Sequence, residues 1–99
     1  MSEQRIELAR NVDDTRFKAI MATHDLIGAR RVHDAIRATR DASIARSGRR
    51  SAMADSMLGR AGEVLTEIEI AEREAWRDFQ SATDAYMAEC NSELGGDGV

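Results

Sequence analysis

A single interruption divides a sequence that otherwise favours helix throughout. The 99 residues contain no proline, so no position forces a kink or a break in a helix. The segment Ser47-Gly48-Arg49-Arg50-Ser51 lies at the midpoint, where Gly48 can end one helix and Ser51 can cap the next. The sequence therefore predicts an all-α protein that consists of two helices and one short turn.

The two expected helices have nearly equal lengths. They cover about residues 3–46 and 51–93, with the turn at 47–50 and a disordered tail at 95–99, and each would be roughly 65 Å long. Equal lengths and a short connection favour a long antiparallel helical hairpin, folded as a single domain over residues 1–94. Gly59 and Gly62 leave two alternatives open. They either break the second helix near residues 59–62 or mark a close helix contact.

The two halves differ in how their apolar residues are distributed around a helix. Those of the second half form one stripe that spans roughly 160° of the helix surface. Those of the first half point in several directions, which one partner helix cannot cover. We therefore expect the hairpins to pair into a four-helix bundle or a coiled-coil-like homodimer. The apolar residues expected at interfaces are Ile20, Ile27, Leu58, Leu65, Ile68, Trp76, Phe79 and Tyr86.

A seven-residue spacing predicts the register between the helices. The two sets with this spacing are Thr15, Ala22, Ala29 and Ile36 in the first half and Ala61, Ile68, Ala75 and Ala82 in the second. A fold at residues 48–49 places the two sets opposite each other, with position numbers that add to 97. Glu72 falls within the apolar stripe, where a carboxylate requires a partner. We expect Glu72 to pair with His24 or Arg30 and to fix this register.

The net charge of −4 conceals a separation of charge along the chain. Residues 30–60 have a net charge of +5 and residues 61–99 a net charge of −8. The predicted basic patch at the turn end consists of Arg46, Arg49, Arg50 and Arg60. Arginine pairs with phosphate and carboxylate alike, so the patch could contact nucleic acid, an anionic membrane or an acidic protein. Nucleic acid is the weaker alternative, because no aromatic residue that could stack on bases lies between positions 18 and 75.

The sequence has no pattern that indicates catalysis or metal binding. The dyads His24-Asp25 and His33-Asp34 are nine residues apart, which places the two histidines on opposite sides of a helix. Cys90 is the only cysteine, so an intrachain disulfide is excluded, and no base is expected beside its thiol. We therefore predict no enzymatic activity, no cofactor and no metal site.

The absence of a long apolar run predicts a cytoplasmic protein without a transmembrane segment or a signal peptide. The chain has only four aromatic residues, so its core should be small and a partner surface is expected. The leading hypothesis is a non-enzymatic protein–protein interaction module that self-associates. One alternative is a small phage- or plasmid-type inhibitor that blocks a nucleic-acid-handling enzyme with its acidic second helix. The other is direct binding of nucleic acid or an anionic membrane by the arginine-rich turn end.

Overall fold

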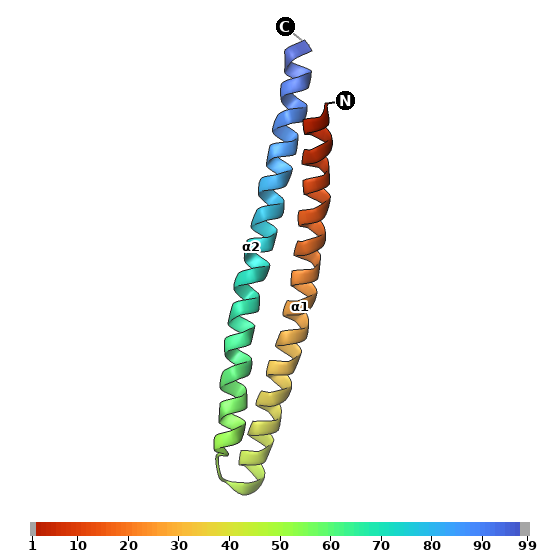
Figure 1. Ribbon diagram of the computed structural model, residues 1–99. Helices are drawn as coiled ribbons and strands as arrows, with labels where there is room; N and C mark the ends of the chain where they lie inside the picture. Colours follow the sequence, from red (N-terminus) through yellow and green to blue (C-terminus); the bar gives the residue numbers. More distant parts are fainter. Residues whose placement is uncertain (1, 98–99) are drawn as a thin grey trace. The chain divides into compact units, whose positions relative to one another are not determined.

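Two long helices make up the computed structural model, which describes residues 2–97 and the side chains from Ser2 to Leu94. Helix α1 spans Glu3–Ser47 and helix α2 spans Ala52–Asp97 (Figure 1). Their contacts define two units: unit 1 contains residues 1–21 and 72–99, and unit 2 contains residues 22–71. In each unit the two helices are antiparallel. The all-α prediction is confirmed, and the single domain over residues 1–94 stays a prediction.

Serine side chains cap the first turn of both helices. The Ser2 hydroxyl accepts a hydrogen bond from the N–H of Arg5 at 3.2 Å, and the Ser51 hydroxyl accepts one from the N–H of Ala54 at 3.3 Å. Each cap satisfies one of the backbone donors that a helix leaves unpaired at its start. An acidic residue in each first turn further suits the positive end of the helix dipole. Both N-termini therefore form for local reasons.

Gly48 ends α1 and reverses the chain within unit 2. Its φ angle is +68°, and its N–H donates to the carbonyl of Ile44 at 2.7 Å. This is the left-handed conformation that closes a helix, and glycine adopts it without a steric penalty. The Ser47 hydroxyl also accepts a hydrogen bond from the N–H of Arg49 at 3.2 Å. The connection is thus held by its own hydrogen bonds.

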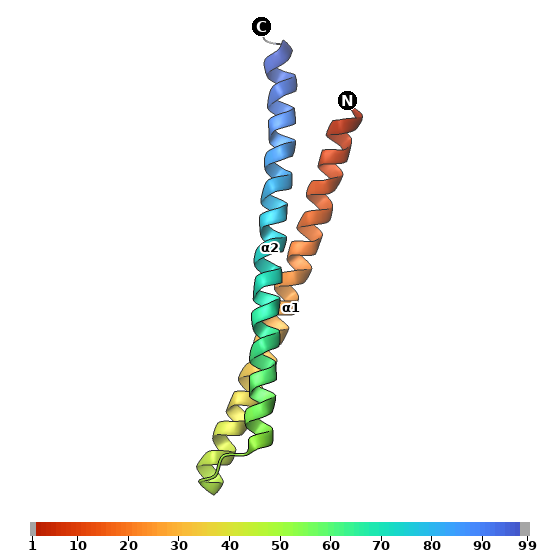
Figure 2. The same cartoon turned by 60° about the vertical axis from the view of Figure 1, so that its left-hand side comes forward.

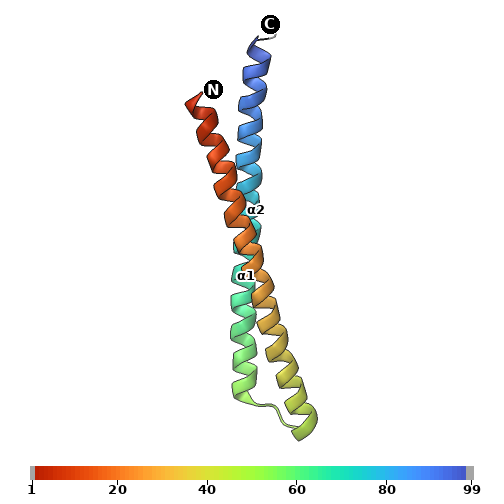
Figure 3. The ribbon, with the colours of Figure 1, turned by 90° about the vertical axis from the view of Figure 1, so that its right-hand side faces the viewer.

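Helix α2 is continuous through Gly59 and Gly62, so the break considered near residues 59–62 is absent (Figure 3). Nothing lies within 4 Å of a Cβ placed at Gly59, whereas one at Gly62 would lie 3.8 Å from Nε2 of His33. The His33 side chain is only 13% exposed. Close helix contact therefore describes Gly62 but not Gly59.

The C-terminal end of α2 lies at Asp97, past the expected end near residue 93. Residues 95–97 of the predicted tail are thus helical here, and residues 98–99 lie outside the described residues. Two glycines occupy this last turn.

A heptad repeat of less exposed positions forms a seam between the helices in each unit. In α1 the seam positions are Arg5, Leu8, Val12, Thr15, Ala19, Ala22, Leu26, Ala29, His33, Ile36, Arg40 and Ser43. In α2 they are Ala54, Leu58, Ala61, Leu65, Ile68, Glu72, Ala75, Phe79, Ala82, Tyr86, Glu89 and Glu93. Alternating steps of three and four residues are the pattern of helices that pack along a/d positions. Both sets predicted from seven-residue spacing belong to this seam.

Contacts across the seam give the register within each unit. In unit 1 Arg5 pairs with Glu93, position numbers that add to 98. Figure 2 shows the start of α1 and the end of α2 at the same end of this unit, as an antiparallel pair requires. In unit 2 the numbers add to 95 for Arg40 with Asp55 and for His33 with Gly62. The predicted sum of 97 is therefore correct to within two residues.

The core formed by these two helices is small. Among the residues that the structure describes, only Ala19, Leu26 and Ala82 are buried hydrophobic residues. The large apolar side chains that stay exposed are Ile6, Phe17, Ile20, Met21, Ile27, Val32, Met53, Met57, Val64, Ile70, Trp76, Met87 and Leu94. The seam covers a narrow line on each helix, so the wider apolar stripe of α2 and the scattered apolar residues of α1 extend beyond it.

Candidate functional site

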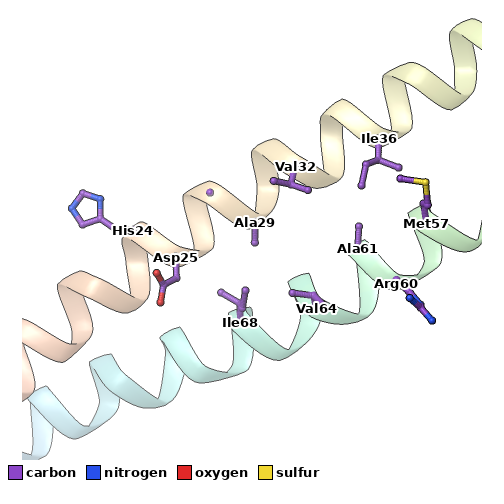
Figure 4. Close-up of a pocket in the computed structure, with 11 residues that line it drawn as sticks. His24, Asp25, Ala29, Val32, Ile36, Met57, Arg60, Ala61, Val64 and Ile68 are labelled. Carbon is purple, nitrogen blue, oxygen red and sulfur yellow. The ribbon is translucent and has the colours of Figure 1, made fainter. Parts of the chain in front are cut away.

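A mostly apolar groove lies between the two helices of unit 2. It has a volume of about 620 Å³ and lies on the side of residues 24–36 and 57–68. Val32 and Val64 lie in the middle of the groove, with Asp25 at one end and Met57 at the other (Figure 4). The residues that line it are His24, Asp25, Gly28, Ala29, Val32, Ile36, Met57, Arg60, Ala61, Val64 and Ile68.

The groove exists because the two sides of the seam are covered unequally. On one side, the flanking residues Gly62 and Glu69 are partly buried. On the other, Val32, Met57 and Val64 are exposed, with Val32 at 57%. A second hollow of about 200 Å³, which shares Ile36 and Met57 with the groove, continues toward the turn. The open side of unit 2 therefore presents aliphatic side chains in a continuous line.

The chemistry of the groove suits an apolar partner surface. Its walls are aliphatic, and its ionisable residues are Asp25, Arg60 and His24. An interface with an apolar centre and charged residues at its edge has this composition. The groove contains no serine, cysteine or lysine that could act as a nucleophile.

Unit 1 contains a more polar hollow and an ion pair across its seam. Arg5 donates to Glu93 at 2.9 Å and the Ser2 hydroxyl donates to the same carboxylate at 3.1 Å. A hydrogen bond to Tyr86 is the largest cause that raises the pKa of Arg5 above its usual value, so Arg5 stays cationic in this cluster. Because both charged side chains are about one-third exposed, the ion pair adds little stability. A hollow of about 380 Å³ in this unit is lined by Asn11, Thr15, Asp78, Ser81, Ala82 and Ala85.

The predicted basic patch is divided between two places. Arg46 lies in the last turn of α1, and Arg49 and Arg50 lie in the connection, all three exposed. The Nε of Arg50 is 3.3 Å from the Asp55 carboxylate, which partly neutralises its charge. Arg60 lies about 12 Å along α2 from the helix start and lines the groove instead. The turn end thus presents three of the four predicted arginines.

The predicted interface residues fall into two groups. Those on the seam, where they are partly buried, are Leu58, Leu65, Ile68, Phe79 and Tyr86. Ile20, Ile27 and Trp76 are exposed. Trp76 and Phe79 contact each other edge to face, with ring centroids 5.8 Å apart. Contact between these residues and a second chain stays a prediction.

The remaining residues singled out in the sequence lie in separate surroundings. His24 lines the groove, whereas Nδ1 of His33 is 3.7 Å from the Asp34 carboxylate on the same helix. Glu72 occupies a partly exposed seam position of unit 1, so its pairing with His24 or Arg30 of unit 2 stays a prediction. Cys90 is half-buried. Within the described part of the chain, no three His, Cys, Asp or Glu side chains are placed to hold a metal ion.

Comparisons with known proteins give no family for this chain. No protein-family model matches the sequence, and no curated protein or solved structure is significantly similar to it. No helix in residues 2–97 is long and apolar enough to cross a membrane.

Among the predicted interface residues, only Ile68 lines the groove. Val32, Met57 and Val64 are not among them, although each is apolar and flanks a seam position. The signal that could have found them is the same seven-residue repeat, shifted by one helix position. Applied to both helices, the shifted repeat places residues 25, 32 and 39 of α1 on the same side of unit 2 as residues 57, 64 and 71 of α2.

Proposed function

We propose that this protein is a non-enzymatic protein–protein interaction module that self-associates. The observation that carries the proposal is the imbalance between buried and exposed apolar residues. In the described residues, thirteen large hydrophobic side chains are exposed, and only Leu26 among the large ones is buried. Single exposed apolar residues are ordinary, but so many beside so small a core are typical of a chain that buries them against a partner.

The accessible surface area supports the same proposal. The chain exposes 7455 Å². A monomeric globular protein of 10.9 kDa would expose about 5,600 Å². This excess on one chain is about twice the roughly 800 Å² that each partner buries in a stable protein–protein interface of standard size. Association is the direct way for a chain of this size to remove that surface from water.

A second copy is the partner that needs no further assumption. Most soluble oligomers are symmetric homo-oligomers, and two-fold dimers are the commonest. Two helical hairpins that pack face to face form a four-helix bundle, which gives the scattered apolar residues of α1 more than one neighbouring helix. The inhibitor hypothesis and the arginine-end hypothesis remain hypotheses, because no contact among the described residues favours either.

Thermal unfolding at different protein concentrations tests the proposal. We expect a hundredfold increase in chain concentration to raise Tm by roughly 5–10 °C, because dissociation accompanies unfolding of a dimer. Circular dichroism at several path lengths measures this shift. A monomeric fold would unfold at the same Tm over the whole range, and that result would contradict self-association.

A further inference from the structure

We propose that the groove of unit 2 is the docking site for a second copy of this chain. The two copies are antiparallel and related by a two-fold axis at the level of Val32 and Val64. This inference rests on the proposed self-association and adds the surface and the geometry. The same stretch of each helix is complementary to itself when its direction is reversed.

Charges on α2 are self-complementary about Val64. Arg60 lies four residues before Val64 and Glu67 three residues after it, so all three share one side of the helix. When a second α2 lies antiparallel with Val64 against Val64, Arg60 of each copy lies beside Glu67 of the other. Symmetry makes this ion pair twice. Parallel copies would instead place like charges together.

Small residues flank Val32 on α1. Ala29 and Ala35 lie three residues on either side of it, and Gly28 has no atom within 4 Å of the position of a Cβ. Small residues at a helix interface let the backbones approach closely, so the valine side chain can pack against its copy.

The two centres of symmetry lie at the same level of unit 2. Contacts across its seam join residues whose numbers add to 95. The numbers of Val32 and Val64 add to 96, so the two valines lie almost opposite each other along the groove, as Figure 4 shows. A single two-fold axis can therefore pass through both centres. If the patterns on the two helices were unrelated, their centres would not be expected to lie at the same level.

Charge reversal on α2 tests the docking geometry in the full chain. Each single variant, Arg60→Glu or Glu67→Arg, replaces two attractive pairs by two repulsive pairs. We expect the dimer dissociation constant to rise about tenfold or more in each. The double variant R60E/E67R restores the attraction and should return the constant to within about threefold of the original. Sedimentation velocity measures all four proteins, and circular dichroism checks that their helix content is unchanged.

Cross-linking tests the position of the axis independently. In a Cys90→Ser background, Val64→Cys places the new thiol of each copy against its symmetry mate, so oxidised glutathione should convert the dimer to a disulfide-linked species. Ile70→Cys is the matched control, because Ile70 is as exposed as Val64 but lies on another side of α2. It should cross-link much more slowly.

The outcomes separate this inference from the proposed function. If the unmodified chain is a monomer, self-association itself fails. If the chain is a dimer, but R60E/E67R is no tighter than the single variants and V64C cross-links no faster than I70C, the groove is not the docking site.

Discussion

Replacing Leu26 by alanine should lower the free energy of unfolding by about 2–4 kcal/mol. Leu26 is 7% exposed and is the only large apolar side chain that is buried in the described residues. The shorter side chain loses the favourable free energy of transferring the leucine carbons from water into the seam. It also leaves a cavity beside small neighbours, including Ala22 and Ala29 on the same seam. Urea unfolding followed by circular dichroism, at one fixed chain concentration, measures the change.

Leu94→Ala is the matched control for this prediction. Leu94 lies on α2 and is 74% exposed, so the same chemical change should alter the free energy of unfolding by less than about 0.5 kcal/mol. Equal effects at the two positions would show that Leu26 is not part of a packed seam.

Replacing Ala82 by glutamate should destabilise the protein by about 2–4 kcal/mol, because it forces a carboxylate into the seam of unit 1. Ala82 is 4% exposed, and the polar side chains around the hollow beside it, Asn11 and Asp78 among them, supply no cation. The glutamate must therefore either lose its hydration or push the helices apart. The midpoint and slope of urea unfolding give the change in free energy.

Ala88→Glu provides the comparison on the same helix. Ala88 is exposed, and glutamate has nearly the helix propensity of alanine, so this variant should unfold close to the original. If A82E were as stable as A88E, Ala82 would have to lie outside the seam.

Features that depend on local sequence could be predicted. Ser2, Gly48 and Ser51 determine the ends of the helices through hydrogen bonds to residues at most four positions away. The seven-residue repeat also placed Thr15 and Ala82 on the seam. Both kinds of signal are readable because a helix relates nearby positions in a fixed way.

Features that depend on how far the helices separate on each side could not be predicted. Periodicity placed Val64 on the apolar stripe, but it did not show that Val64 would be left exposed beside the seam while Leu65 is partly buried. The ion pair between Arg5 and Glu93 likewise requires the three-dimensional register, since 88 positions separate the two residues. The break considered at Gly59 and Gly62 did not form, because the cost of two glycines is small against the cooperative formation of a helix of 46 residues.

The central claim is that the chain completes its core by association with a second copy. Size-exclusion chromatography with multi-angle light scattering at micromolar concentration tests this claim most directly. The account predicts a mass of about 21.8 kDa, twice the 10.9 kDa of one chain. A mass of 10.9 kDa that persists as the concentration is raised would contradict it.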